Sequence, residues 1–314
     1  MNPFVRIMRL VMMLNWFMFL YCTWFMFVHF LERGPSPITT TTDDFKGCKP
    51  HAVDFRKSFG RIIWRLNTKI HGQPLAILPA IRLIKKNFRF LSTGSPIVIE
   101  LYGPSGTGKS YVCELLAESM FYDGLKSEFV NVLDGEDLHL QEEQLSLYTD
   151  ELRDYLRGNL TKCKKSLFIF KHTEKIPEEL FHPIQDIMLS KMGGIFLFTT
   201  TESSPIVSEI YAHLLTQGTE KRQMNFKHYE RALRKPLFNI GERLLFLPMT
   251  VNELKMCAVD ELAKMGDTFL TDCITESIYK RIPVDTVGYT NMTCKEIIQV
   301  TRYVVIHNNC DIQQ

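Results

Sequence analysis

The sequence predicts an α/β fold, a parallel sheet covered by helices, followed by a small helical domain. Short apolar segments alternate with amphipathic ones between about residues 97 and 200, a pattern typical of parallel strands joined by helices. A glycine-rich loop, "GPSGTGKS", separates the first apolar segment from a helix-forming one. After "LLFLP" at 244–248 the pattern is helical. A composition of 45% hydrophobic and 23% charged residues leaves room, in 314 residues, for one large domain and one small one.

The N-terminus is predicted to span a membrane. Residues 10–31 read "LVMMLNWFMFLYCTWFMFVHFL", a run without Asp, Glu, Lys or Arg. A helix of this length crosses a hydrocarbon core of about 30 Å. We therefore expect residues 1–33 to form a cytosolic stub and a transmembrane signal anchor, with a cleaved signal peptide as the alternative. Arg6 and Arg9 precede the run, and the positive-inside rule then places the rest of the chain in the lumen of the endoplasmic reticulum.

The cysteines and the glycosylation sequons are consistent with a location in the lumen. Seven cysteines follow the apolar run, an odd number that leaves at least one thiol free. Asn159 and Asn291 begin the sequons "NLT" and "NMT", which are glycosylated only in the lumen. The formal charge is +2 and the basic residues are dispersed, so we expect no nucleic-acid partner.

The large domain is expected to span residues 55–247, after a linker at 34–54 that starts with a Pro- and Thr-rich stretch. Apolar residues at helical spacing predict helices at 52–70 and 75–88. Four strands are predicted, at "SPIVIELYG", "EFVNVLDG", "SLFIF" and "GGIFLFTTT". Helices are predicted between them at "KSYVCELLAESMF" and at 145–157.

The small domain is expected to span residues 248–314. Its sequence predicts helices at 250–265, 271–281 and 294–306, with a strand or turn before the last of them. The chain therefore ends in a helical domain that follows the sheet.

The loop after the first strand matches the phosphate-binding pattern G-x-x-x-x-G-K-[ST]. Its glycines let backbone N–H groups point at phosphates, and the N-terminus of the next helix adds partial positive charge. Lys109 would reach the β- and γ-phosphates, and Ser110 would bind Mg²⁺. We therefore expect ATP or ADP here, with a tight turn that binds no ligand as the alternative. The predicted cofactor-binding residues are Gly103, Pro104, Ser105, Gly106, Thr107, Gly108, Lys109 and Ser110.

A second interpretation concerns "VLDGEDL" at 132–138. An acidic segment some two dozen residues after a P-loop resembles that of small nucleotide-type kinases, where an aspartate orients the acceptor. Asp134 or Asp137 would take that part. The alternative is a second strand that ends in a solvated acidic turn.

Several separated segments carry a family resemblance. They are "LYGPSGTGKSYV", "LRGNLTKCKKSLFIF", "GIFLF", "YERALRKPLFN", "FLPMTVNELKMC" and "TCKEI". With these residues the chain resembles the torsins, luminal members of the AAA+ ATPase class, from about Phe55 to the C-terminus. The resemblance implies an AAA+ P-loop domain with a central parallel sheet and a small C-terminal helical domain. A kinase would not predict the last four segments.

The resemblance also implies covalent features and a further nucleotide contact. The family's disulfides correspond to Cys48 with Cys163 and to Cys257 with Cys294. Asn159 matches the glycosylated position, and Lys295 matches the sensor-2 lysine that touches nucleotide phosphate. Cys113 lies on the P-loop helix facing the core and is the candidate free thiol. The pairing of Cys273 and Cys310 stays open.

Three positions depart from the family pattern. In AAA+ proteins the third strand ends in the Walker B pair Asp-Glu, which holds Mg²⁺ and orients the attacking water, and here Lys171 and His172 stand there. Thr199 replaces the sensor-1 asparagine. Replacing the two acids removes the groups that would hold Mg²⁺ and adds positive charge close to that of the metal. We hypothesise that Lys171 stands in for Mg²⁺, and that hydrolysis lacks its usual electrostatic and positioning contributions.

Alternatives remain open at this strand end. Glu174, two residues beyond the expected glutamate, or His172 itself could supply a base for hydrolysis. Lys171 and Lys175 could instead belong to a solvated basic face beside an empty nucleotide site.

The sequence thus predicts a membrane-anchored torsin-like protein of the endoplasmic reticulum lumen and nuclear envelope. It is expected to bind ATP or ADP and to hydrolyse ATP poorly or not at all, acting through nucleotide-dependent partner binding. The partners implied by the resemblance are a luminal, membrane-anchored activator of related fold or other torsin subunits. An active, activator-dependent ATPase and a P-loop kinase are the alternatives.

Overall fold

The computed structural model describes residues 55–87, 93–138, 142–229, 233, 235–266, 272–284 and 290–307. The predicted anchor at 10–31, the linker at 34–54 and Cys48 lie outside these ranges. Within the described ranges, no helix is both long and apolar enough to cross a membrane.

A five-stranded parallel sheet forms the centre of the fold, with strand order β2-β3-β4-β1-β5. Its strands are β1 Ile97–Tyr102, β2 Val130–Asp134, β3 Leu167–Lys171, β4 Ile195–Thr200 and β5 Glu242–Leu245. All residues of β1 and β4 are buried, as expected for strands covered by helices on both faces. The four predicted strands are present, and "LLFLP" contributes to a fifth, which pairs with β1.

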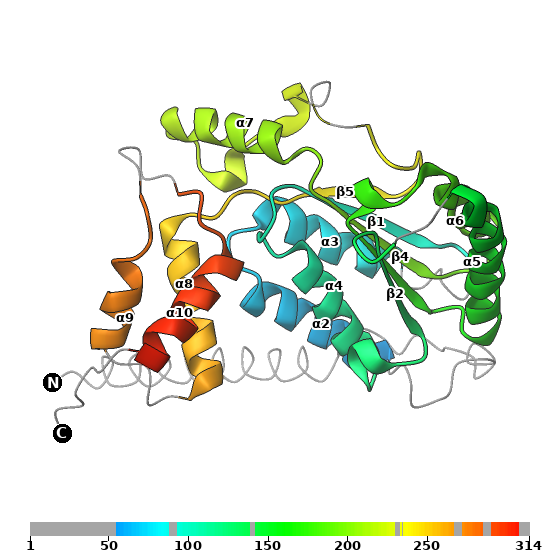
Figure 1. Cartoon of the computed structure of the whole chain (residues 1–314), viewed down its shortest axis with the longest axis horizontal. Coiled ribbons are helices and arrows are strands. Elements are labelled where there is room, and N and C mark those ends of the chain that lie inside the picture. The colour runs from blue at the N-terminus through cyan, green and yellow to red at the C-terminus, as the bar shows by residue number, and fades with distance from the viewer. Residues whose placement is uncertain are drawn as a thin grey trace, which may run out of the picture. The chain divides into compact units, whose positions relative to one another are not determined.

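Alternate strand residues face two separate cores, because side chains of a strand point to opposite faces in turn. Ile169 of β3 belongs to one core. Phe168 and Phe170 belong to the other, where they stack on Phe196 and Phe198 of β4 at centroid distances of 5.1 and 4.8 Å. The first face is covered by α2 Phe55–Lys69, α3 Pro74–Asn87 and α4 Lys109–Met120, and the second by α5 Glu142–Lys162 and α6 Phe181–Leu189 (Figure 1).

Some elements of the sheet region differ from the prediction. The helix α5 is longer than the predicted 145–157. The helices α6 and α7, Ser204–Thr216, were not predicted. Pro183 and Pro205 interrupt the apolar pattern of these short helices, although proline is tolerated in a first turn. Short 3₁₀ turns also occur: η3 Gly124–Lys126, η4 Thr173–Lys175, η5 Glu178–Leu180, η6 Lys221–Gln223 and η7 Phe226–Tyr229.

Three helices follow the sheet in the described part of the C-terminus and pack around a core of their own. These C-terminal helices are α8 Val251–Met265, α9 Asp272–Tyr279 and α10 Cys294–His307, close to the predicted ranges. A capping box starts α8: the Thr250 hydroxyl accepts from the Glu253 N–H, and the Glu253 carboxylate accepts from the Thr250 N–H. Residues 290–293 precede α10 as irregular chain.

The cysteines of the described residues fall into two kinds. The expected disulfide between Cys257 and Cys294 is present and joins α8 to the start of α10. Cys163 and Cys273 are also disulfide-bonded; Cys48 lies outside the described ranges, so pairing of Cys163 with Cys48 stays a prediction. Cys113 is free and buried, and burial raises its pKa to about 12, which leaves an unreactive thiol.

Candidate nucleotide-binding site

The P-loop lies between β1 and α4, where its glycines allow close packing. Gly103 has φ 135°, and a Cβ there would lie 2.2 Å from the carbonyl oxygen of Phe246, just beyond β5. Gly106 has φ 69°, and a Cβ there would lie 2.5 Å from the side chain of Thr293, just before α10. Since larger residues would be both strained and obstructed, glycine is required at these two positions. The loop thus touches both the sheet and the C-terminal helices.

Lys109 is folded back into the loop that precedes it. Its Nζ donates to the carbonyl oxygens of Gly103 at 2.7 Å and Pro104 at 2.6 Å. Burial lowers the pKa of Lys109 to about 8, against the opposing effect of the Glu174 carboxylate. This cation is therefore held by neutral carbonyls, and an anionic phosphate would be a stronger partner for it.

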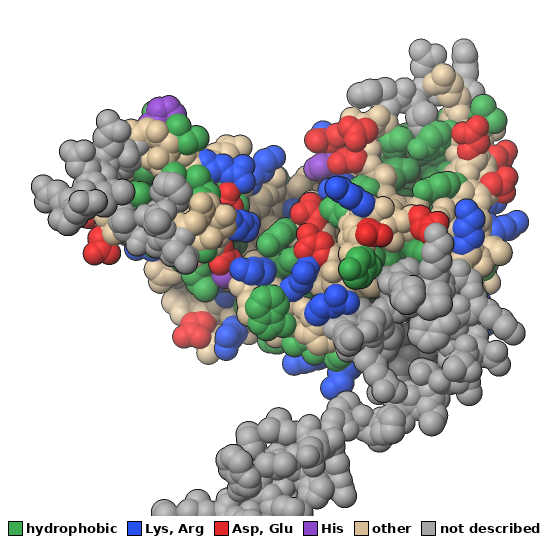
Figure 2. Space-filling model, turned by 90° about the horizontal axis from the view of Figure 1, so that it is seen from below, with side chains coloured by type: hydrophobic (Ala, Val, Ile, Leu, Met, Phe, Trp, Pro, Cys, Tyr) green, Lys and Arg blue, Asp and Glu red, His purple; other side chains and the backbone are tan. Residues whose placement is uncertain are grey.

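A cavity of about 510 Å³ opens over the P-loop, within the usual size range of ligand sites. Its wall is drawn from the P-loop, from the ends of β3 and β4, and from the C-terminal helices. With histidine neutral the wall has a charge of +2, which suits an anionic ligand. The basic residues of the wall are Lys69, Lys109, Lys264, Lys295 and Arg302, and the acidic ones are Glu114, Asp260 and Glu261. In the view of Figure 2 the surface is hollowed between the C-terminal helices, at the left, and the sheet, at the right.

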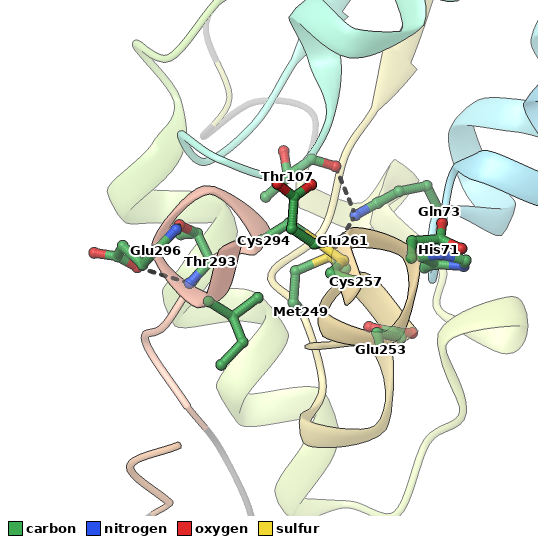
Figure 3. The surroundings of a disulfide bond; sticks show 12 residues. His71, Gln73, Thr107, Met249, Glu253, Cys257, Glu261, Thr293, Cys294 and Glu296 are labelled. Atoms are coloured by element: carbon green, nitrogen blue, oxygen red, sulfur yellow. Dashed lines mark hydrogen bonds and ion pairs between the residues drawn. A yellow bond between two sulfur atoms is a disulfide. The ribbon is translucent and has the colours of Figure 1, made fainter. Parts of the chain in front are cut away.

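The start of α10 brings the predicted Lys295 to this cavity. Thr293 caps the helix: its N–H and hydroxyl donate to the Glu296 carboxylate at 2.7 and 2.9 Å. Lys295 follows in the first turn, and the Cys257–Cys294 disulfide also lines the cavity. Figure 3 shows the disulfide below Thr107 of the P-loop, with Gln73 and Thr293 on either side.

The three degenerate positions have different surroundings. His172 and Thr199 line the cavity. Lys171 ends β3 opposite Asp134 of β2, is not among the lining residues, and places its Nζ 3.9 Å from the Glu114 carboxylate on α4. Glu114 does line the cavity. The ammonium of Lys171 is therefore separated from the cavity by the Glu114 side chain.

His172 and two acids form a compact polar group at the ends of β2 and β3. His172 adopts a left-handed backbone with φ 48°, and its Nδ1 lies 2.7 Å from Asp134 Oδ1 and 3.9 Å from Glu136 Oε2. Burial raises the pKa of Asp134, but the hydrogen bond with His172 and neighbouring positive charges outweigh it and leave the pKa lowered. Three ligand atoms so close could hold a divalent cation. Glu136 already pairs with Lys175, so internal contacts satisfy these carboxylates.

These contacts bear on the two interpretations of the acidic segment. Asp134 is not a freely solvated acid, since it is bonded to His172 and to the Glu136 N–H. Asp137 belongs to the same turn, where its N–H donates to the Asp134 carbonyl.

Glu174 is held at the end of β4 rather than exposed in a loop. Its carboxylate accepts from the N–H of Thr201 at 3.3 Å and from the Thr201 hydroxyl. Burial raises the pKa of Glu174, but these hydrogen bonds outweigh burial and leave its pKa below the usual range. The acid is therefore ionised close enough to Lys109 to affect its pKa, although it is not among the cavity-lining residues.

Sequence reasoning missed the part of the site that lies between α2 and α3. Ile70 and His71 line the cavity, and His71 Nε2 bonds to Asp260 of α8 at 2.9 Å. Gln73 is buried and contacts the P-loop directly. No motif marks these residues, because they reach the site only through the folding of α2 and α3 onto the sheet.

Comparison with known proteins agrees with the fold and the P-loop. A family comparison matches the torsin family over residues 44–170. Human Torsin-3A is 25% identical over 303 residues, which cover 87% of this chain and 76% of that protein. Among solved structures, the S. cerevisiae Hsp104–ADP complex matches with a TM-score of 0.50 and 14% identity, over 80% of this chain and 48% of that one. The chain thus spans about half the length of the Hsp104 chain.

A parallel sheet with a P-loop after β1, followed by helices that line the same cavity, is an α/β fold that this chain shares with the Hsp104 structure. In sequence, the chain is similar to the torsin family over residues 44–170 and to human Torsin-3A over most of its length.

Proposed function

We propose that this protein binds ATP or ADP in the cavity over the P-loop and hydrolyses ATP poorly or not at all. The observation that carries the proposal is an intact phosphate loop, with Lys109 and Lys295 at one cavity, beside a strand end where Lys171 and His172 replace two acids. The left-handed glycines form the kind of cradle that phosphates occupy. The solved Hsp104 structure of similar fold is an ADP complex. In this proposal residues 55–247 and 248–314 act as the large and small domains around the nucleotide.

The residues present do not fit a bound Mg²⁺ well. The P-loop offers hydroxyls such as that of Ser110 but no carboxylate, whereas Mg²⁺ is held by carboxylates and phosphates in octahedral geometry. At the end of β3 stands Lys171, and a unit charge 4 Å from it is worth about 4 kcal/mol at an effective dielectric of 20. The proposal is therefore that nucleotide binds without the metal, with the Lys171 charge taking the metal's electrostatic part.

Hydrolysis needs a group that orients or activates water, and the two candidates are engaged elsewhere. The imidazole of His172 is bonded to Asp134, and the Glu174 carboxylate is bonded to Thr201. A base must come within hydrogen-bond reach of the attacking water. Binding without turnover is consistent with this arrangement, and it would make the protein a nucleotide-dependent partner rather than a motor.

A second candidate, an active ATPase, is favoured by one observation. Glu174 is ionised, partly buried and near Lys109. If a partner freed its carboxylate from Thr201, Glu174 could serve as the base. Single-turnover hydrolysis of ATP by the full chain, alone and with a candidate activator, tests this: a Glu174→Gln variant should abolish any turnover that the activator produces.

Location and partners follow the family. We propose that the chain acts in the lumen of the endoplasmic reticulum or nuclear envelope, anchored by residues 10–31, with an activator or other torsin subunits. Asn291 of the second sequon is exposed before α10, whereas Asn159 of the first is half-buried near the end of α5 and donates its amide N–H to the Tyr155 carbonyl, so Asn291 is the more accessible acceptor. Loss of mass on endoglycosidase treatment of the protein isolated from cells would support this luminal location.

The direct test is calorimetric titration of the purified full chain with ATP and ADP, in Mg²⁺ and again in EDTA. We expect equal affinities in the two buffers. A Lys109→Ala variant should lose binding in both, because it removes the phosphate-facing cation. Strict Mg²⁺ dependence would overturn the metal-free proposal, and no binding in either buffer would overturn nucleotide binding altogether.

A further inference from the structure

Gln73 is a buried amide between α2 and α3 that connects two parts of the nucleotide site. Its side chain is 3% exposed. Its Nε2 donates to the carbonyl oxygens of Leu247 at 2.9 Å and Thr107 at 3.3 Å, and its Oε1 accepts from the Leu247 N–H at 2.8 Å. The sulfur of Met249 lies 3.4 Å from the same nitrogen. Figure 3 shows Gln73 reaching Thr107 and Met249 from the side opposite Thr293.

These hydrogen bonds place Gln73 beside the segment that connects β5 to α8. The last backbone bond that continues the β1–β5 pairing runs from the Phe246 N–H to the Tyr102 carbonyl at 2.8 Å. At the next residue, Leu247, the Gln73 amide bonds both the N–H and the carbonyl, as a neighbouring strand would. An amide has two N–H donors, and the second one is left for Thr107. Gln73 therefore joins residue 247, in the segment between β5 and α8, to the P-loop.

Two further contacts tie the α2–α3 connection to α8. Lys221 donates to the Gly72 carbonyl at 3.2 Å and to the Glu253 carboxylate at 2.5 Å, and His71 bonds Asp260. Among the described residues, the hydrogen bonds of Lys221 and His71 do not reach the P-loop. The contact of Gln73 with Thr107 is what sets it apart.

We propose that Gln73 is the positioning residue through which a nucleotide phosphate on the P-loop is sensed by the C-terminal helices. Thr107 lies inside the loop, between two left-handed glycines, so phosphate bound to the loop N–H groups acts on the peptide that carries the Thr107 carbonyl. The same Nε2 donates to the Leu247 carbonyl before α8, so a change at one acceptor alters the bond to the other. The proposal rests on the proposed nucleotide binding, and it adds the route by which binding changes the C-terminal helices.

Hydrogen–deuterium exchange of the full chain, with and without ADP, tests this coupling. Gln73→Met removes the amide with little change in volume, and Gln73→Glu keeps an acceptor for the Leu247 N–H but removes both donors. Lys221→Met is the matched control, because it breaks a tie between the α2–α3 connection and α8 that does not involve the P-loop. In the wild type we expect ADP to slow exchange over residues 103–112 and over 247–265 by about threefold to tenfold, the range of one or two buried hydrogen bonds.

In both Gln73 variants, ADP should still slow exchange over residues 103–112 but leave 247–265 unchanged, whereas Lys221→Met should keep both responses. A response over 247–265 that survives in the Gln73 variants would overturn the coupling while leaving nucleotide binding intact. Absence of any ADP response in the wild type would overturn nucleotide binding, and the coupling with it. Gln73→Glu decides the matter if Gln73→Met does not fold.

Discussion

At Lys109 the chain buries a cation inside its own phosphate loop. The ammonium is satisfied by two carbonyl oxygens, which stabilise it less than water or a phosphate would. Burial accordingly brings its pKa down to about 8, so that Lys109 loses its proton within an accessible pH range. Bound phosphate favours the protonated form and raises the pKa. Nucleotide binding should therefore take up a proton above pH 8.

The affinity for ADP is predicted to fall as pH rises through the pKa of Lys109. Well below its pKa of about 8, Lys109 is almost fully charged and the affinity is constant. Between about pH 7 and 9 the dissociation constant should rise about tenfold, the effect of one linked proton. Titration calorimetry at pH 9 in two buffers of different ionisation enthalpy would report the uptake of one proton. A flat profile up to pH 9 would contradict the geometry at Lys109.

A carboxylate at position 171 is predicted to restore metal dependence. Lys171→Asp places an acid at the end of β3, where it could hold Mg²⁺ with Ser110 and phosphate oxygens. Addition of Mg²⁺ should then strengthen ATP binding by the variant about tenfold, because the new carboxylate and the metal form one charge pair of modest strength. Mg²⁺ should leave ATP binding by the wild type unchanged. Lys126→Asp makes the same change of charge at an exposed position outside the cavity wall and should show no Mg²⁺ effect. If the Lys171→Asp variant stays insensitive to Mg²⁺, Lys171 does not occupy the place of the metal.

The P-loop could be predicted from the sequence, whereas the contacts of His172 and Glu174 could not. The P-loop residues could be predicted, because their glycines and lysine have a fixed spacing that a phosphate requires. The bonds of His172 to Asp134 and of Glu174 to Thr201 could not. They depend on the left-handed backbone at His172, a conformation that non-glycine side chains adopt rarely and that no local pattern indicates.

At the scale of elements, α8 depends on its first turn for both stability and position. The Thr250 hydroxyl and the Glu253 carboxylate satisfy two N–H groups that the helix leaves unbonded. Glu253 also bonds Lys221 and lies against Gly72, where a Cβ would come within 2.0 Å of its carboxyl carbon. The cap thus holds the α2–α3 connection as well as the helix.

Loss of this cap is predicted to destabilise the protein measurably. Thr250→Ala should lower the free energy of unfolding by about 1 kcal/mol, the usual cost of removing an N-cap hydroxyl. Denaturant titration of the purified chain measures it. Thr68→Ala serves as control, since the exposed Thr68 hydroxyl bonds only to its own helix at Trp64, and should change stability by less than about 0.5 kcal/mol. Equal effects of the two substitutions would show that the cap is not significant.

For the whole molecule, the sequence predicts the layers better than it predicts how they meet. Apolar strands between helices indicate a parallel sheet, and that sheet is present. The strand order, with β1 between β4 and β5, is not encoded in any local pattern, because it arises from which faces pack together. The same holds for Gln73 and the His71–Asp260 pair, which join segments 174 and 189 residues apart.

Because the cavity wall combines the P-loop with α8 and α10, nucleotide is predicted to stabilise the sheet and the C-terminal helices together. ADP at a hundred times its dissociation constant should add about 2.7 kcal/mol to the free energy of unfolding, which raises Tm by roughly 5–10 °C in a chain of this size. Differential scanning calorimetry should show one transition that moves as a whole, and Lys109→Ala should show no shift. Two transitions, with only one moved by ADP, would mean that the ligand contacts the sheet without engaging the helices that close the cavity.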